Sequence, residues 1–367
     1  MNDTRPPAAQ SPWWDPERFA ARLPYLKARA RIAEALRAWF AARGFVEVET
    51  PALQVSPGLE PHLIAFATEL KEPFQDGPGR RLYLHTSPEF TMKKLLVAGL
   101  PRLYQLAHAF RNAERSPTHH PEFAMLEWYR ADSGWRDAAA DCEGLVRAAL
   151  AASPDDLRSG RHALVRGAAS CDPNLPWQYL SVADAFDRFA GIDLLATAPD
   201  AARPDVEALA RAAQRIGLTT GERDSWDDVF FRIFLDRIEP NLGVGVPTVL
   251  HDWPVSMAAL ARRKPNDPRV AERFEVFVCG LELANGFGEL TDAAEQRRRF
   301  AADVAKKQAL YGERYPVDED FLAALERGMP ESAGVALGFD RLVMLATGAP
   351  TIDDILWAPV ARTDTGR

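Results

Sequence analysis

Two apolar runs separated by a charged loop constrain the fold of this chain more than any other feature. The first run covers residues 103–110 and ends at Arg111, and a loop rich in His, Arg and Pro follows it. The second run ends at Arg130 and carries two glutamates, Glu122 and Glu127. This pattern predicts a hairpin of two strands with a charged tip. An arginine fixed at the end of a strand suits a phosphate, because its planar fork binds phosphate oxygens in pairs.

Composition narrows the class of protein. The 367 residues, 47% of them hydrophobic, leave room for one large domain or two with a substantial core. A net charge of −8 argues against a general nucleic-acid binder. No run of about 18 uninterrupted apolar residues is present, so we expect no membrane span. Three widely spaced cysteines, Cys142, Cys171 and Cys279, lack zinc or redox spacing and predict reduced thiols in a cytoplasmic protein.

The order of the predicted elements favours an α+β fold, in which an antiparallel β-sheet is flanked by helices. A long helix over residues 17–43 ends at Gly44 and leads into a strand over residues 45–50. The later strands do not alternate strictly with helices, which argues against a doubly wound parallel sheet. Further strands are predicted over residues 82–85, 248–251, 273–278 and 282–287, and a final strand and helix over residues 335–345.

Three segments stand apart from this core. Residues 1–16 are rich in proline and predict a flexible N-terminal arm ahead of one domain over residues 17–367. Residues 153–177 are rich in Pro, Gly, Ser, Ala and Arg, which predicts a surface insertion. Helical periodicity between about residues 178 and 245 predicts a helical insertion.

A glycine-rich segment near the C-terminus supplies a second arginine. Residues 334–341 contain Gly334 and Gly338, which let the backbone approach a ligand closely. Arg341 is predicted to open a helix, where it could hold a further phosphate. The alternative is a glycine-rich turn between strand and helix with an arginine on the surface.

Three acids recur on predicted apolar strands at seven-residue spacing. Glu275, Glu282 and Glu289 are costly there unless each pairs with a cation or a donor, and hard carboxylate oxygens suit Mg²⁺. Seven-residue spacing places successive acids on opposite faces of a flat strand. Nearby glycines, such as Gly280, could supply bulges that correct this. The alternative is a set of surface carboxylates on an edge strand.

Taken in order, three segments of the chain resemble the motifs of the class II aminoacyl-tRNA synthetases, most closely those of the lysyl branch. Residues 17–51 resemble motif 1, residues 103–130 motif 2 and residues 334–341 motif 3. The resemblance implies a class II synthetase catalytic core over residues 17–367. Because motif 1 builds the dimer interface in that family, the resemblance also implies a homodimer.

The resemblance is strongest to the free-standing lysyl-tRNA synthetase paralogues that modify elongation factor P, the EpmA/PoxA/GenX family. Segments such as 84–89, 94–99, 125–130 and 270–276 are similar to that family almost word for word. An anticodon-binding domain would need roughly 100 further residues, so we expect no such domain and do not expect tRNA as the acceptor. The resemblance implies that the chain activates (R)-β-lysine, or lysine, with ATP and Mg²⁺ and transfers it to a lysine ε-amine of elongation factor P.

The resemblance also implies a role for each candidate site residue. Arg111 and Arg341 are expected to make the catalytic phosphate contacts, and Mg²⁺ is expected near Glu275 and Glu282. ATP contacts are expected from Arg111, Ala113, Glu114, His119, His120, Phe123, Glu282, Leu283, Gly338 and Arg341. Contacts to the amino-acid substrate are expected from Ser87, Glu89, Tyr129, Asn285, Glu289 and Ala336.

The chain departs from the family pattern at two positions, Ala113 and His120, and differs from true lysyl-tRNA synthetases at a third, Ala336. Ala113 holds the place of a motif 2 glutamate, with Glu114 one residue later, and a small loop shift could let Glu114 serve. His120 replaces an asparagine, and a histidine N–H can replace an amide donor. Ala336 stands where synthetases carry glycine, and a methyl group there is worth roughly 1–3 kcal/mol of substrate discrimination.

Two alternatives stay open. The chain could be an α-lysine-activating ligase that acts on tRNA or a small molecule, or a non-catalytic synthetase-like binding module. Modules of that kind tend to lose their phosphate arginines, so the presence of Arg111 and Arg341 favours an enzyme. Five basic residues could form a positive rim for the acceptor or, equally, a solvated face: Lys93, Lys94, Arg102, Arg115 and Arg130.

Overall fold

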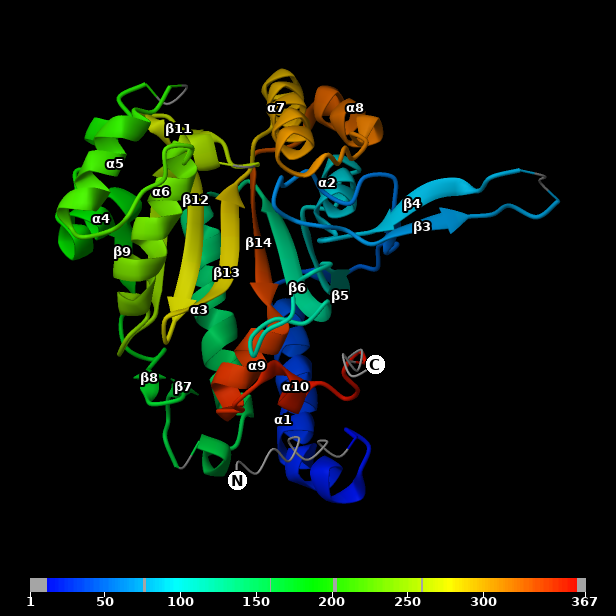
Figure 1. The fold of residues 1–367 in the computed structure, drawn as a ribbon. Coiled ribbons are helices and arrows are strands. Elements are labelled where there is room, and N and C mark those ends of the chain that lie inside the picture. The colour runs from blue at the N-terminus through cyan, green and yellow to red at the C-terminus, as the bar shows by residue number, and fades with distance from the viewer. Residues whose placement is uncertain (1–11, 75–76, 159, 201–202, 259, 362–367) are drawn as a thin grey trace, which may run out of the picture.

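A nine-stranded sheet forms the centre of the molecule (Figure 1). The computed structural model describes residues 12–74, 77–158, 160–200, 203–258 and 260–361. In spatial order the strands are β1 (Val46–Glu47), β5 (Arg102–Phe110), β6 (Glu122–Ala131), β14 (Ser332–Gly338), β13 (Leu281–Gly288), β12 (Asp267–Val278), β10 (Thr248–Pro254) and β9 (Gln178–Ser181), with β11 (Arg263–Lys264) paired to β12. Neighbouring strands are antiparallel except for the edge pairs β1–β5 and β10–β9. The predicted α+β fold with an antiparallel sheet is confirmed.

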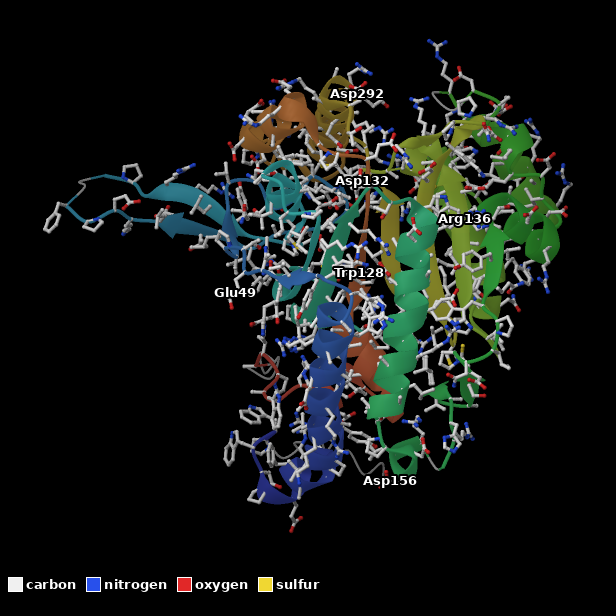
Figure 2. The ribbon with its side chains drawn as sticks, turned by 180° about the vertical axis from the view of Figure 1, so that it is seen from behind. Glu49, Trp128, Asp132, Arg136, Asp156 and Asp292 are labelled. Carbon is white, nitrogen blue, oxygen red and sulfur yellow. The ribbon has the colours of Figure 1, made fainter. Side chains whose placement is uncertain are left out.

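One face of the sheet packs on helices and forms a large core. Four helices contribute to it: α1 (Pro16–Ala41), α3 (Trp135–Ala152), α9 (Phe339–Thr347) and the short α10 (Ile352–Ile355). Figure 2 shows α1 and α3 side by side, and the two helices are in contact. Alternate residues of the central strands, such as Trp128 and Val335, are buried in this core. Because side chains alternate along a strand, the residues between them point to the opposite face of the sheet.

Helix α1 matches the long N-terminal helix predicted from the sequence, with slightly different ends. The Asp15 carboxylate accepts hydrogen bonds from the N–H groups of the first turn, so the helix begins at Pro16. It ends at Ala41, and Gly44 then turns the chain with a φ of 72°. Of the predicted flexible arm, residues 1–11 lie outside the described residues.

The opposite face of the sheet carries further helices. Three of them share a second core: α2 (Glu89–Val97), α7 (Ala293–Tyr311) and α8 (Glu319–Gly328). A small sheet beside them projects away from the body of the molecule (Figure 1): β2 (Leu53–Gln54), β3 (Ala67–Leu70) and β4 (Arg80–Leu84). In the part of the chain that the structure describes, no helix has the length and apolar composition that a bilayer span requires.

The segment predicted as a surface insertion is part of the main body. Within residues 153–177, the strands β7 (Leu164–Arg166) and β8 (Ala169–Cys171) form a hairpin. Leu164, Cys171 and Trp177 are buried in the main core. The prediction of a surface insertion was therefore wrong for these residues. The polar composition of the segment outweighed its three buried apolar side chains in the sequence analysis.

The helical insertion is present but begins later than predicted. Residues Gln178–Ser181 form β9, which pairs in parallel with β10 and so belongs to the main sheet. Three helices follow and enclose an apolar core of their own: α4 (Val182–Ala190), α5 (Val206–Arg215) and α6 (Trp226–Ile233). Helix α6 continues into a π-helical turn over Phe234–Ile238.

The hairpin of β12 and β13 contains a tight turn and a bulge. Its two-residue turn, Cys279–Gly280, has φ values of 53° and 65°, and a type I′ turn requires positive φ at both positions. Val276 pairs with Ala284, whereas the next residue of β12 pairs with Glu282. Leu283 is therefore the extra residue of a β-bulge.

This bulge explains how two acids seven residues apart, Glu275 and Glu282, can lie on the same face of the hairpin. Glu275 pairs with Asn285, and the bulge shifts the alternation so that Glu282 lies on the same face of the hairpin. The bulge lies at Leu283 and not at a glycine, which corrects the expectation from the sequence. Gly280 serves the turn instead.

Candidate active site

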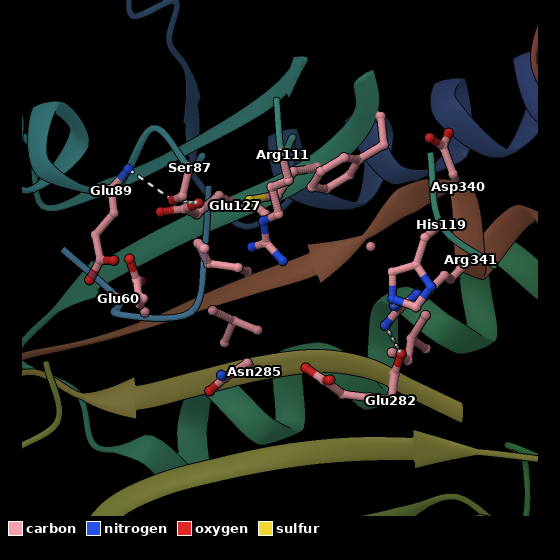
Figure 3. A pocket seen from close by; sticks show the side chains of 18 of the residues that line it. Glu60, Ser87, Glu89, Arg111, His119, Glu127, Glu282, Asn285, Asp340 and Arg341 are labelled. Atoms are coloured by element: carbon pink, nitrogen blue, oxygen red, sulfur yellow. Dashed lines mark hydrogen bonds between the residues drawn. The ribbon is translucent and has the colours of Figure 1, made fainter. Parts of the chain in front are cut away.

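A cavity of about 440 Å³ lies over the face of the central strands that points away from α1 and α3 (Figure 3). Two rows of cross-strand neighbours form its floor, and the members of a row share one face of the sheet. The rows are Glu127, Ala336 and Asn285, and next to them Tyr129, Gly334, Phe287 and Arg273. Residues far apart in the sequence therefore meet in one cavity, with Ala336 directly between Glu127 and Asn285.

Arg111 directly follows β5 and lies between the two ends of the cavity (Figure 3). Its backbone N–H donates to the carbonyl of Pro121 at 2.9 Å, which ties it to the start of β6. Its guanidinium carbon is 5.3 Å from the centre of the Phe123 ring. Its Nε atom is buried and has no hydrogen-bond partner within the described residues. The structure thus holds Arg111 in place and leaves a donor for a ligand.

Arg341 lies in the first turn of α9, which begins after Gly338. It donates to the backbone carbonyl of Glu282 at 2.7 Å and to Nε2 of His119 at 2.6 Å. Burial, followed by the charges of Arg341 and Arg111, lowers the pKa of His119 to about 4. His119 is therefore neutral at pH 7, and its Nε2 can accept the hydrogen bond from Arg341. Both predicted phosphate arginines line the same cavity.

Asp340, which the sequence analysis left without a role, anchors the start of α9. Its Oδ2 accepts a hydrogen bond from the backbone N–H of Ala124 on β6 at 2.8 Å. Its Oδ1 pairs with Arg29 of α1. Asp340 is almost fully buried, so these two partners are what makes its burial tolerable. The position of Arg341 is consequently tied to both β6 and α1.

Glu127 lies at the other end of the cavity and is a site residue that the sequence analysis missed. It accepts hydrogen bonds from the hydroxyl of Ser87 at 2.6 Å and from the hydroxyl of Tyr129 at 2.6 Å. Burial, followed by the charge of Glu89, raises the pKa of Glu127 to about 8. Its position as an acid in the middle of an apolar strand was the signal that could have found it.

Lys93 joins the two predicted substrate acids, Glu89 and Glu289. Its Nζ lies 2.5 Å from Glu89 Oε1 and 2.6 Å from Glu289 Oε2, and the side chain is 1% exposed. Burial raises the pKa of Glu289 to about 7 even though Lys93 lowers it, and burial likewise raises the pKa of Glu89. Lys93 is therefore an internal counter-ion and not part of a positive rim. Arg130 is paired as well, with the buried Asp141 at 2.9 Å.

Glu60 adds a further carboxylate that the sequence analysis missed. It lines the cavity, and Figure 3 shows its carboxylate turned toward that of Glu89. The charge of Glu60 helps to raise the pKa of Glu89. Glu60, Glu89, Glu127 and Glu289 thus face one end of the cavity, where Lys93 pairs with two of them. This end of the cavity favours a cationic ligand, while the end near Arg341 favours an anionic one.

Glu275 and Glu282, the predicted magnesium ligands, lie on one face of the hairpin, and Glu282 lines the cavity. Glu275 is buried and pairs with Arg273 at 2.6 Å. Burial, followed by the charge of Glu282, raises the pKa of Glu275 to about 8, and a divalent cation would relieve this repulsion. Within the described residues, no three His, Cys, Asp or Glu side chains converge on one point. A magnesium ion would therefore complete its shell with phosphate oxygens and water.

The predicted ATP contacts in the loop between β5 and β6 are only partly present. His119 and Phe123 line the cavity, as do Leu283 and Gly338, whereas Ala113 and Glu114 do not. Ala113 has a φ of 62°, which an alanine rarely adopts. His120 borders the cavity, but both of its ring nitrogens have protein partners: Nδ1 lies 2.5 Å from the Glu122 carbonyl, and Nε2 accepts from the Val360 N–H at 3.1 Å. Both ring nitrogens of His120 are thus held by contacts within the protein.

The chain is similar to known ligases over nearly its whole length. Residues 15–362 match the family described as tRNA synthetases class II (D, K and N). A protein of Proteus mirabilis (strain HI4320) named elongation factor P–(R)-β-lysine ligase is 40% identical over 351 residues, which cover 95% of this chain and 98% of that protein. Proteins with the same name from Klebsiella pneumoniae (strain 342) and Histophilus somni (strain 2336) are 39% and 37% identical, covering 95% and 94% of this chain and 98% and 96% of those proteins.

Glu127→Gln is expected to flatten the dependence of the melting temperature on pH. In the wild type the pKa of Glu127 rises from 4.5 to about 8 on folding, so the folded state holds a proton that the unfolded state releases. The stability that this proton contributes is present at low pH and is lost as the pH rises through that interval. Glutamine does not titrate, so the variant lacks this loss.

The measurement is the melting temperature of the ligand-free protein at half-unit pH steps. Glu326→Gln, which changes an exposed carboxylate on α8, serves as the matched control. Equal pH slopes in the wild type and the Glu127→Gln variant would contradict the assignment.

Proposed function

Because the chain belongs to the class II tRNA synthetase family (D, K and N), we propose that it is an ATP-dependent ligase that joins (R)-β-lysine to a lysine ε-amine of elongation factor P. The shared name of its relatives supports the reaction. The observation that carries the proposal is the cavity itself, which has Arg341 at one end, Arg111 between the two ends and an excess of carboxylates at the other end (Figure 3). Such a cavity suits a nucleotide and a cationic amino acid side by side.

In the first step, the substrate carboxylate attacks the α-phosphorus of ATP. This carboxylate is already ionised at neutral pH and needs no general base. The new bond joins the carboxylate oxygen to phosphorus, and the bond from the α-phosphorus to the bridging oxygen breaks, giving an aminoacyl-adenylate and pyrophosphate. Arg111 contacts the α-phosphate and Arg341 the terminal phosphate, so catalysis rests on positioning and charge neutralisation. Mg²⁺ held near Glu275 and Glu282 supplies further positive charge to the phosphates.

The acid end of the cavity selects a diamino acid. Two ammonium groups match the excess negative charge around Glu89, Glu127 and Glu289, which a neutral amino acid would leave uncompensated. Asn285 contributes an acceptor, because its Oδ1 is buried and lacks a hydrogen-bond partner among the described residues. Ser87 and Tyr129 act by holding Glu127 in place.

In the second step, the uncharged ε-amine of the acceptor lysine attacks the carbonyl carbon of the adenylate. An amide bond forms, the bond from that carbon to the phosphate oxygen breaks, and AMP leaves. The amine proton passes to solvent or to AMP. The acceptor must therefore present a flexible, extended lysine at the mouth of the cavity.

A panel of assays tests the proposal against its alternatives. Pyrophosphate exchange is measured with (R)-β-lysine and with α-lysine, and transfer is measured to elongation factor P and to bulk tRNA. We expect the highest exchange with (R)-β-lysine and transfer only to the protein. Transfer of α-lysine to tRNA would favour the synthetase alternative, and no exchange with either isomer would favour the binding module.

Two further expectations remain part of the proposal. A homodimer is supported by exposed apolar side chains that lie between residues 46 and 70, in and after motif 1: Val46, Leu53, Val55 and Leu70. A cytoplasmic location is supported by the three cysteines, all free and buried.

Arg341→Ala is expected to lower the rate of pyrophosphate exchange by about 100- to 1,000-fold, because it removes a preorganised donor to the phosphates. Exchange is measured at saturating amino acid. Arg211→Ala, which removes an exposed arginine of α5, controls for the loss of a surface charge. Exchange near the wild-type rate in Arg341→Ala would contradict the motif 3 assignment.

Ala336→Gly is expected to shift preference toward α-lysine by about 10- to 200-fold in relative kcat/KM, the size of one methyl contact. The reason is that Ala336 lies between Glu127 and Asn285 on the cavity floor. Parallel adenylation assays with both isomers give the ratio, and a melting curve reports the packing. If the Ala336 methyl group has only a packing role, the activities with both isomers and the melting temperature fall together. The ratio of the two activities then stays unchanged.

Leu53→Asp is expected to give a monomer, because it buries a charge in the proposed dimer interface. Light scattering at micromolar concentration should report twice the chain mass for the wild type and one chain mass for the variant. Leu310→Asp, at an exposed apolar position near the end of α7, is the control and should remain dimeric. A monomeric wild type would exclude the dimer.

A further inference from the structure

The C-terminal segment 352–360 packs against the outer side of the loop between β5 and β6. We call this segment the C-terminal strap. It begins with α10 (Ile352–Ile355), whose first N–H donates to the carbonyl of Pro117 at 2.8 Å. At the other end, the N–H of Val360 donates to Nε2 of His120 at 3.1 Å. The carbonyl of Val360 accepts longer contacts from Arg115 at 3.4 Å. The strap thus holds the loop at two places, and its first residue, Ile352, also borders the cavity.

His120 transmits the contact from the strap to β6. Since Nε2 accepts from the N–H of Val360, the ring proton is assigned to Nδ1, which donates to the carbonyl of Glu122 at 2.5 Å. The side chain is 3% exposed. A buried ring with both nitrogens bonded is a rigid spacer between the strap and the first residue of β6.

The residues on either side of His120 connect it to the two arginines of the cavity. His119 precedes His120 in the chain and accepts from Arg341 at 2.6 Å. Pro121 follows His120, and its carbonyl accepts from the N–H of Arg111 at 2.9 Å. A displacement of His120 would therefore disturb the surroundings of both phosphate arginines, although His120 itself makes no phosphate contact.

We propose that the C-terminal strap positions the nucleotide loop, and that His120 is the positioning residue through which it acts. The strap has a firm base, because the guanidinium of Arg22 on α1, which is 4% exposed, donates to the carbonyl of Leu356. The inference rests on the proposed use of ATP. It assigns the strap an effect on the nucleotide site and none on the amino-acid pocket, which lies at the far end of the cavity (Figure 3).

Val360→Pro removes the N–H that His120 accepts and keeps the carbonyl, while Val360→Ala keeps both. We expect Val360→Pro to raise the KM for ATP in pyrophosphate exchange by about 3- to 10-fold, the effect of one lost hydrogen bond. The KM for the amino acid should stay within about twofold of the wild-type value. Val360→Ala should match the wild type. Equal KM values for ATP in the two variants would overturn the proposal.

A second series keeps the test valid if Val360→Pro distorts the strap more widely. His120→Leu removes both ring nitrogens, and His120→Gln restores an acceptor near the position of Nε2. We expect His120→Leu to raise the KM for ATP and His120→Gln to recover part of the loss. The double variant His120→Leu/Val360→Pro should be no worse than the more impaired single variant, because both remove the same bond.

Additive effects of the two substitutions would show that Val360 and His120 act separately, and would overturn the proposal. A wild-type protein that exchanges no pyrophosphate with either lysine isomer would instead contradict the proposed function. A change in the KM for the amino acid equal to that for ATP would indicate general loosening of the structure and would also count against the strap.

Discussion

The pairing register of β6, β14, β13 and β12 is the constraint on which both the core and the site depend. Residues such as Trp128 and Val335 face the helices, and their neighbours Tyr129 and Ala336 face the cavity. A slip of one residue in any of these pairs would exchange the two sets and bury charge in the core. The apolar packing that stabilises the sheet therefore also fixes the positions of the functional side chains. The bulge at Leu283 is the one departure from strict alternation that the site needs.

Charge is strongly separated within the cavity. Carboxylates gather around Lys93 at one end, whereas Arg341 lies beside His119 at the other end and Arg111 lies between them (Figure 3). Buried carboxylates that lack a full complement of cations are costly, as the raised pKa values of Glu127 and Glu289 indicate. The dicationic substrate proposed above would favour the ionised forms of these carboxylates and would offset part of the cost of burying them. The charge balance of the cavity would in this way contribute to the proposed selectivity.

Local patterns in the sequence predicted the parts of the site that depend on chain neighbours. Arg111 after an apolar strand and Arg341 after a glycine-rich strand both carry their signal in the adjacent residues. Lys93 could be placed only in part, because Glu89 lies four residues earlier on the same helix, whereas Glu289 follows β13 and comes near Lys93 only in the folded protein. The partners of His120 could not be foreseen in full for the same reason, since one of them, Val360, lies near the opposite end of the chain. Isolated acids in apolar strands, such as Glu127, were visible but lacked a partner in the sequence.

Strand β14 has a consequence for how the protein is made. It lies between β6 and β13 in the middle of the sheet, yet it comes from residues 332–338. During synthesis, β6 and β13 each present an unpaired edge until this segment leaves the ribosome. Exposed edges of this kind invite pairing with other chains. A chain that ended before residue 338 would leave the facing edges of β6 and β13 without the strand that pairs with both.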